Sequence, residues 1–235
     1  TDGYYIMLIV DDCPKDMTQK RSNPLGIDVG IKTYATISNG ERCLKVPNPN
    51  KTNRNIKKAE RKIIALQRVI SGKVEKNKRK GGTATDIYQS KNIQKLWVRV
   101  RKYMTQLRNI RRDFIKKLCH MLVVKAKPRY ITIEDLGTED MLKQAGHKLA
   151  DRLQKCNLYY FRTHLTWKCK QYGIELRIAD RMFASSKTCS GCGHKKSKLG
   201  LRTRTYVCKH CGLTLDRDKN AAINLLRTEK YTLAY

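Results

Sequence analysis

The sequence contains few acidic residues. Its 235 residues include 20 Asp and Glu against 51 Lys and Arg, so the formal net charge is +31, and the excess runs along the whole chain. Such a charge attracts polyanions and raises their association rate. Ribosomal proteins, histones and nucleic-acid enzymes share this composition. The charge therefore indicates nucleic acid as a partner, but it does not by itself indicate an activity.

Long hydrophobic runs are also absent. No stretch approaches the ~18 uncharged apolar residues of a membrane-spanning helix, so no membrane partner is expected. Residues 1–10 contain a short apolar run without a basic leader or a small-residue cleavage site, which predicts a strand over residues 4–10 rather than a signal peptide. Because the chain begins with Thr1 and enters this strand almost at once, we expect the N-terminal part of a longer protein to be missing.

The cysteine count is odd, at nine, and five of the nine are scattered singly along the chain. This pattern argues against a disulfide framework and for a reducing compartment. We therefore expect an intracellular protein, cytoplasmic or associated with the nucleoid if the host is a prokaryote. The five single cysteines are expected to be small packing residues; they are Cys13, Cys43, Cys119, Cys156 and Cys169.

The period of the apolar residues changes along the chain. Residues 25–37 and 41–46 are predicted to form strands joined by a turn at Ser38–Gly40. Between residues 51 and 127, two apolar stripes in charged sequence predict a long basic helical hairpin, broken at Gly81–Gly82. The stripes are Ile56, Ala59, Ile63, Leu66 and Ile70, then Ile93, Leu96, Trp97, Val100, Met104, Leu107, Ile110, Phe114, Leu118 and Met121. The charge of this hairpin either only keeps it soluble or forms a surface that faces polyphosphate.

Four further elements are expected after the hairpin. They are a strand at 128–134, a helix with Leu149, Leu153, Cys156 and Tyr160 on one face that runs to about Tyr172–Gly173, a strand at 174–178, and a helix from about Asp216 to Arg227. Residues 137–146 are expected to form an exposed, mobile loop that acts as a flap over the active site.

Two Cys-x-x-Cys pairs, Cys189/Cys192 and Cys208/Cys211, are separated by fifteen residues. Each pair presents two thiolates to one ion, and together they complete a closed tetrahedron that suits Zn²⁺. An iron–sulfur cluster and a redox pair are the alternatives, which the basic intervening sequence disfavours. Four protein ligands leave no open position, so the zinc is expected to be structural. Tyr206–Val207 is expected to be a strand of a zinc ribbon, with His194 and His210 as bystanders or phosphate contacts.

Carboxylates stand at the edges of three predicted elements. Asp28 lies within an apolar strand, Glu134 ends another, and Asp216 and Asp218 open the last helix, where a helix cap accounts for one of the two but not for both. Unpaired buried carboxylates are costly, and several brought together repel one another until a divalent cation neutralises them. Two Mg²⁺ or Mn²⁺ ions about 4 Å apart in such a cluster activate water and stabilise the leaving oxygen of a phosphodiester.

Four sequence motifs occur in a diagnostic order: 26–30 (GIDVG), 133–136 (IEDL), 185–193 (SSKTCSGCG) and 216–224 (DRDKNAAIN). Over about residues 24–227 the chain resembles the TnpB proteins. These are the transposon-encoded OrfB proteins of IS200/IS605 and IS607 type elements, which are related to the type V CRISPR nucleases.

The resemblance implies an α/β fold: an RNase H-like (RuvC) mixed sheet with a helical hairpin insertion and an inserted four-cysteine zinc ribbon. The implied parts are 1–23 as the end of a wedge-like N-terminal region, 24–50 as RuvC part I, 51–127 as the basic helical insertion, 128–184 as RuvC part II, 185–214 as the zinc ribbon that binds target nucleic acid, and 215–235 as RuvC part III.

The resemblance further implies an RNA-guided DNA endonuclease in the intact parent, with target DNA and a guide RNA as partners. The implied cofactors are one structural Zn²⁺ and two catalytic Mg²⁺ or Mn²⁺ ions held by Asp28, Glu134 and Asp218. Asp218 takes the third place because it lies two residues before Asn220-Ala-Ala, and Asp216 is then a helix cap or a neighbour of the site.

Two other functions remain open: a nucleic-acid-binding module or repressor that does not cut, and a transposase that performs strand transfer with the same acids. In the nuclease, a displaced single strand is expected to follow basic and aromatic surface. The candidate stacking residues are Tyr159, Tyr160, Trp167 and Tyr206, for each of which core packing is the alternative.

Overall fold

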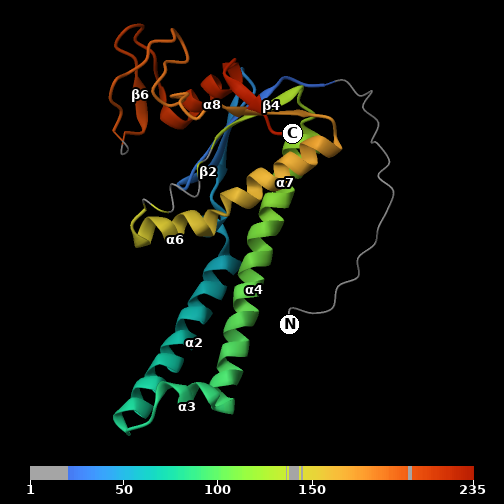
Figure 1. The fold of residues 1–235 in the computed structure, drawn as a ribbon. Helices are drawn as coiled ribbons and strands as arrows, with labels where there is room; N and C mark the ends of the chain where they lie inside the picture. The colour runs from blue at the N-terminus through green and yellow to red at the C-terminus, as the bar shows by residue number, and fades with distance from the viewer. Residues whose placement is uncertain (1–20, 136, 138–142, 144, 201–202) are drawn as a thin grey trace. The chain divides into compact units, whose positions relative to one another are not determined.

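The computed structural model describes residues 21–235 except 136, 138–142, 144 and 201–202 (Figure 1). The expected strand at 4–10, Cys13 and most of the expected loop at 137–146 lie outside these residues. The chain divides into two compact units. One contains Pro49–Phe114, and the other contains the described residues up to Asn48 together with Ile115–Tyr235.

The second unit is built on a six-stranded mixed sheet with the order β3-β2-β1-β4-β5-β8. The three consecutive strands β1, β4 and β5 are parallel, and the other three each run antiparallel to their neighbours. The strands are β1 (Leu25–Val29), β2 (Thr33–Ser38), β3 (Cys43–Pro47), β4 (Tyr130–Glu134), β5 (Glu175–Ala179) and β8 (Tyr231–Leu233). The predicted strands near 25–37, 41–46, 128–134 and 174–178 are therefore confirmed, with residues 25–37 forming two strands rather than one.

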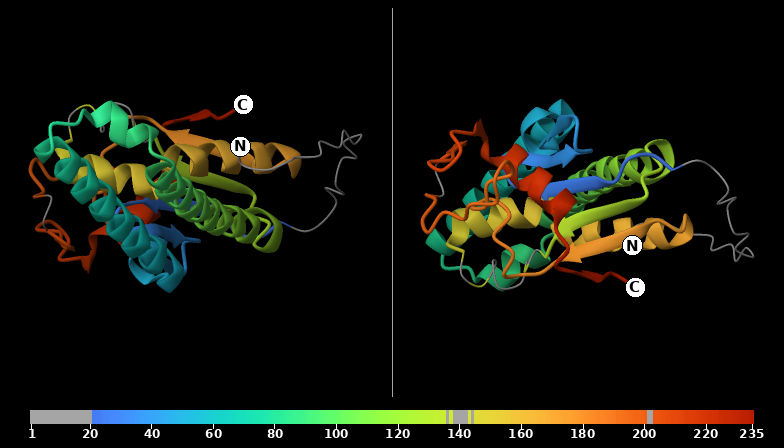
Figure 2. Two further views of the ribbon diagram at one scale, coloured as in Figure 1. Left: turned by 90° about the horizontal axis from the view of Figure 1, so that it is seen from below. Right: turned by 90° about the horizontal axis from the view of Figure 1, so that it is seen from above.

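Helices cover both faces of this sheet (Figure 2). On one face lies α8 (Arg217–Arg227), which confirms the predicted last helix. A Cβ added to Gly26 of β1 would lie 2.2 Å from the carbonyl oxygen of Ala222, so only glycine permits this approach of helix to strand. On the other face lies α7 (Leu158–Gln171), whose Phe161 ring meets the Tyr34 ring edge-on at 5.9 Å between centroids.

The single helix predicted from about Leu149 to Tyr172 is wrong, because the structure has two helices there. The helix α6 (His147–Cys156) ends where Asn157 adopts a left-handed φ of 53°, and α7 begins at the next residue. Asparagine tolerates this conformation better than most residues, and it interrupts the α-helical hydrogen-bond ladder. Leu149, expected on the buried face, is 45% exposed.

The first unit is a helical hairpin, as predicted. Its core contains Ile56, Ala59, Ile63 and Ile70 of α2 together with Val100 and Leu107 of α4, at alternating three- and four-residue or seven-residue spacings. Met104, expected in this stripe, is exposed, and the short helix α3 was not predicted. The helices are α1 (Pro49–Thr52), α2 (Arg54–Arg79), α3 (Ala84–Gln89) and α4 (Lys91–His120), and α4 continues as a π-helix at Met121–Lys125.

A two-stranded ribbon, β6 (Thr205–Val207) with β7 (Thr214–Asp216), lies just before α8, so the strand expected at Tyr206–Val207 is confirmed. Cys119, Cys156 and Cys169 are buried, as expected for packing residues, whereas Cys43 is only half-buried. Within the described residues, no helix combines the length and the apolar character needed to cross a bilayer.

Candidate functional site

Asp28 and Glu134 come level with each other at the carboxyl ends of two neighbouring parallel strands. Strand β1 pairs with β4 in the register Gly26 to Thr132 and Ile27 to Ile133, and the next residue along each strand is an acid. Since side chains alternate along a strand, Asp28 faces the same side as Gly26, the side on which α8 packs. Sequence alone places an acid on each strand; the register brings the two together.

The helix α8 brings the third acid to the same place. Asp216 caps the helix, because its Oδ1 accepts hydrogen bonds from the backbone N–H groups of Asp218 and Lys219, each at 3.1 Å. Asp216 also forms an ion pair with Lys45 of β3 at 2.7 Å. One of the two acids is thus a helix cap, as expected, and that acid is Asp216. The carboxylate of Asp218 lies 4.0 Å from the guanidinium of Arg204.

The charges of these acids act on one another. Burial raises the pKa of Asp28 well above its ordinary value, and the nearby charges of Glu134 and Asp218 raise this pKa further, against the opposing charge of Arg217. Burial also raises the pKa of Glu134, although the Ser185 hydroxyl, which donates to its Oε1 at 3.3 Å, and Arg217 oppose this. The structure therefore concentrates negative charge that a bound cation would neutralise.

Oxygen ligands of this kind suit Mg²⁺ or Mn²⁺. The three carboxylates are more widely spaced than the ligands of a single closed site. Among the described residues, the four cysteines form the only group of three or more potential metal ligands whose ligand atoms all lie within 4.8 Å of one another.

The four cysteines converge as a metal-binding group. The Sγ atoms of Cys189 and Cys211 are 3.6 Å apart, and those of Cys192 and Cys208 are 3.7 Å apart. Four sulfurs at the usual Zn–S distance of about 2.3 Å form a tetrahedron with edges of about 3.8 Å. The group could therefore hold a metal ion.

Two buried asparagines on α8 tie the cysteine segment to the acidic site, and sequence reasoning missed both. Asn220 donates to the carbonyl of Thr188 at 2.7 Å and accepts from the N–H of Ser190 at 2.9 Å. Asn224 donates to the carbonyls of Ser185 and Thr188 at 2.7 and 2.6 Å. The available signal was a pair of amides four residues apart on the face of α8 that also carries buried alanines.

Arg217 was also missed. Its guanidinium donates to the carbonyl of Gly200 at 3.0 Å and to the Ser186 hydroxyl at 3.4 Å, and its charge reaches Asp28 and Glu134. Its position between the two acids of the Asp-Arg-Asp sequence was the available signal. A cation at this place partly balances the carboxylates.

The candidate stacking aromatics fall into two groups. Tyr206 is fully buried, and its hydroxyl donates to the carbonyl of Lys187 at 3.2 Å, so it is a packing residue of the ribbon. Tyr159 and Trp167 on α7 are 71% and 53% exposed, and Tyr160 is half-buried. His194 and His210, the neighbours of the cysteines, stack in parallel with ring centroids 5.6 Å apart.

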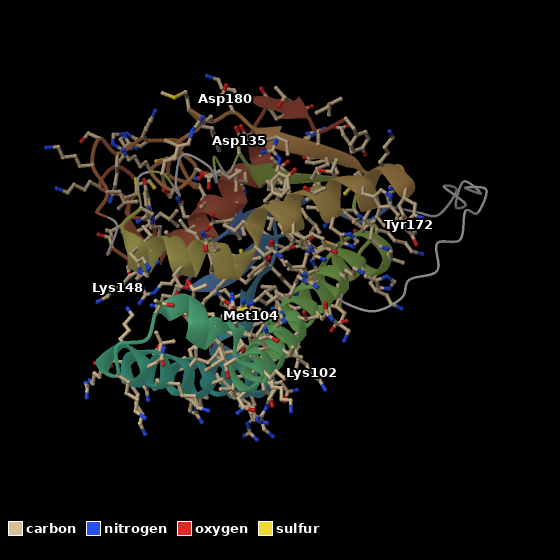
Figure 3. The ribbon with its side chains drawn as sticks, turned by 60° about the horizontal axis from the view of Figure 1, so that its bottom comes forward. Lys102, Met104, Asp135, Lys148, Tyr172 and Asp180 are labelled. Atoms are coloured by element: carbon tan, nitrogen blue, oxygen red, sulfur yellow. The ribbon has the colours of Figure 1, made fainter. Side chains whose placement is uncertain are left out.

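The helix α7 is linked to the acidic site through Asp135, which follows Glu134. The Arg162 guanidinium pairs with Asp135 at 2.8 Å. Figure 3 labels Asp135 beside α7 and Tyr172 at the carboxyl end of that helix.

Two family models match the chain. Residues 8–145 match the OrfB/IS605 model, described as "Probable transposase", and residues 159–225 match the "Cas12f1-like, TNB domain". A "Putative RNA-guided DNA endonuclease" of Streptomyces pristinaespiralis is 35% identical over 202 residues, which are 86% of this chain and 44% of the relative. The "TnpB-like protein L79" of Acanthamoeba polyphaga mimivirus is 29% identical over 227 residues, which are 95% of this chain and 40% of the relative.

A solved structure shares the fold. It is described as the "Cryo-EM structure of the Cas12f1-sgRNA-target DNA complex", and it matches with a TM-score of 0.56 and 21% identity over 86% of this chain and 49% of the Cas12f1 chain. The chain spans less than half the length of the curated relatives named above. The OrfB model alone covers more than half of the chain, and the predicted resemblance is confirmed: the chain belongs to the TnpB, or OrfB, family of IS605-type probable transposases.

Proposed function

We propose that this chain carries the catalytic part of a metal-dependent DNA endonuclease of the TnpB type. The observation that carries the proposal is the convergence of Asp28, Glu134 and Asp218, from two parallel strands and a helix, in a chain of net charge +31. A polyanionic substrate is attracted by the whole chain, and the acids form a local negative site that binds cations.

We also propose that the six-stranded sheet is an RNase H-like, RuvC-type sheet. Three features support it: the mixed sheet order, an acid at the end of the central strand β1, and a second acid at the end of its parallel neighbour β4. We assign residues 24–50, 128–184 and 215–235 to its three parts, 51–127 to the basic helical insertion, 185–214 to the zinc ribbon, and 1–23 to the end of a wedge-like region.

Asp28, Glu134 and Asp218 would hold two Mg²⁺ or Mn²⁺ ions. Bound there, the ions supply activation of a water and stabilisation of the leaving oxygen of the scissile phosphodiester. Ser185 orients the Glu134 carboxylate through its hydroxyl. Asp216 and Lys45 fix the start of α8, and with it the position of Asp218. Arg217 contributes positive charge beside the acids, where a phosphate would approach.

The remaining cofactor and partners follow from the same assignment. One Zn²⁺ would be held by Cys189, Cys192, Cys208 and Cys211 and would stabilise the ribbon without taking part in cleavage. Target DNA is the proposed substrate, and a guide RNA would direct the cut. The sgRNA and target DNA named for the Cas12f1 structure support both partners.

The experiment is cleavage of labelled DNA in Mg²⁺, with and without co-expressed RNA. Because all three acids contribute to one site, Asp28→Ala and Asp218→Ala should each abolish cutting. The control Asp151→Ala, which removes an exposed carboxylate paired with Lys155, should retain it. Asp216→Ala, which loses the helix cap that positions Asp218, should weaken cutting less than Asp218→Ala. Products should carry 5′-phosphate and 3′-hydroxyl ends.

The other two functions predict different outcomes. DNA binding without cutting in every protein tested would indicate a binding module or repressor. Joined DNA products would indicate strand transfer, the activity suggested by the description of the matching family. Loss of cutting in Asp216→Ala but not in Asp218→Ala would reverse the assignment of the third acid.

A further inference from the structure

A row of stacked rings runs along α7 beside its buried side. The rings of Tyr160 and His164 lie 5.7 Å apart between centroids with 9° between their planes, and those of His164 and Trp167 lie 5.6 Å apart with 26° between them. The spacing of four and then three residues places all three rings along one face of the helix. We call these three residues the aromatic ladder.

The ladder is separate from the apolar side of α7. Phe161, Leu165 and Cys169 supply the buried side and are fully covered. Trp167 keeps 53% of its surface exposed. Tyr160 and His164 beside it are half-buried, so the ladder ends in one large ring that remains in contact with water although an ordinary apolar face is buried elsewhere on the same helix.

The charges around the ladder are positive. The Lys168 ammonium lies 5.6 Å from the Trp167 ring centroid and 5.4 Å from the Tyr172 ring centroid. Partial burial and the charges of Lys168 and Lys116 lower the pKa of His164, which favours the neutral ring. Flat, near-parallel rings bordered by ammonium groups match a ligand that has both flat bases and phosphates.

We propose that the aromatic ladder is a stacking platform for the bases of single-stranded nucleic acid. A base stacks on Trp167, and Lys168 binds the adjoining phosphate. The ion pair of Arg162 with Asp135 ties the amino-terminal half of α7 to the residue after Glu134, and the ladder extends from there toward Tyr172 at the carboxyl end of the helix (Figure 3). This proposal rests on the proposed function in one respect, that the ligand is a nucleic acid. It can be tested without measuring cleavage.

Fluorescence of Trp167 provides a direct test. The chain has two tryptophans, so Trp97→Phe leaves Trp167 as the only one, and Asp28→Ala without Mg²⁺ prevents cutting. A 20-nucleotide oligo(dT) should quench this fluorescence, because a stacked base contacts the indole. Polyglutamate, which is anionic but has no bases, should not. Absence of quenching by oligo(dT), or equal quenching by polyglutamate, would overturn the proposal.

Affinity for fluorescently labelled oligo(dT), measured by anisotropy, gives the second readout. Trp167→Ala should weaken binding by about 5- to 150-fold, the usual effect of removing one stacking side chain, and Trp167→Phe should restore most of it. Tyr88→Ala is the control: this tyrosine lies on α3, is 45% exposed and belongs to no stacked pair among the described residues, so binding should be unchanged.

The two proposals fail separately. Oligo(dT) affinity equal to that of the parent in Trp167→Ala, with the circular dichroism spectrum preserved, would overturn the platform even if the chain cuts DNA. A chain that shows Trp167-dependent binding but no Mg²⁺-dependent cutting would support the platform and contradict the nuclease.

Discussion

Among single residues, Asp28 is proposed to bind the catalytic metal ions, and its charge destabilises the folded protein. Its pKa is raised in the folded protein by burial and by Glu134 and Asp218. A carboxyl whose pKa is raised on folding destabilises the protein progressively as the pH rises above the ordinary carboxyl range, and the full penalty is present above the raised pKa. The metal-free protein is therefore expected to be strained electrostatically at this residue, and a bound cation should relieve that strain.

The first prediction is that Asp28→Asn raises the thermal unfolding midpoint of the Mg²⁺-free protein at pH 7. The amide has nearly the same shape and removes the charge penalty, and each 1 kcal/mol gained raises the midpoint of a protein this size by about 2–4 °C. Differential scanning calorimetry at pH 7 and at lower pH would measure it, and the gain should shrink as the pH falls.

The control for this change is Asp151→Asn, which removes an exposed carboxylate that is paired with Lys155 on the same helix. It should have little effect, since such surface pairs contribute little stability. Added Mg²⁺ should raise the midpoint of the wild type but not that of Asp28→Asn. A lower midpoint for Asp28→Asn at pH 7 without Mg²⁺ would contradict the prediction.

At the scale of elements, α8 connects the cysteine group to the acids. Asn220 and Asn224 form hydrogen bonds with backbone groups at both ends of the segment from Ser185 to Ser190. This segment and α8 should therefore unfold together. Buried carbonyls deprived of their donor cost about 1–3 kcal/mol. The ribbon therefore has a direct structural link to the helix that carries Asp218.

The second prediction is that Asn224→Ala lowers the unfolding midpoint by several degrees. The substitution leaves the carbonyls of Ser185 and Thr188 without this donor, and about 2–4 °C should be lost for each 1 kcal/mol. Asn109→Ala, at an exposed position of α4, should leave the midpoint unchanged or slightly higher, because alanine favours helix. Equal midpoints for Asn224→Ala and the wild type would show that the link is not stabilising.

The elements themselves were largely predictable, and the failures have identifiable causes. Apolar spacing found α2, α4 and α8 and the central strands, because those elements bury one face. It missed the break at Asn157, where the chain takes a left-handed conformation that no apolar stripe reports. It also misjudged Met104, which lies within the stripe but stays exposed, since one long stripe was assumed to be buried along its whole length.

For the molecule as a whole, the acids could be identified from the sequence, but their proximity in the fold could not. Asp28 and Glu134 are more than a hundred residues apart, and only the parallel pairing of β1 with β4 makes them neighbours. That pairing depends on contacts between strands separated by the entire helical hairpin. Local pattern therefore gave the residue types, the motif resemblance gave their proposed roles, and the register supplied the geometry.

The third prediction concerns the salt dependence that a net charge of +31 imposes on DNA binding. If six to ten phosphates are contacted, duplex affinity should fall by about 10³- to 10⁵-fold between 50 and 200 mM salt, because bound counterions are released on binding. Stacking on Trp167 is not screened in this way. The ratio of oligo(dT) affinities between the parent and Trp167→Ala should therefore stay constant over the same range.

Lys168→Gln is the complementary variant for this titration. It removes one phosphate contact and should reduce the magnitude of the slope of log affinity against log salt by about one unit. Trp167→Ala should leave the slope itself unchanged, because it removes no charge. If the parent and Trp167→Ala bound oligo(dT) with equal affinity at 200 mM salt, the Trp167 ring would be acting by positioning Lys168 rather than by stacking on a base.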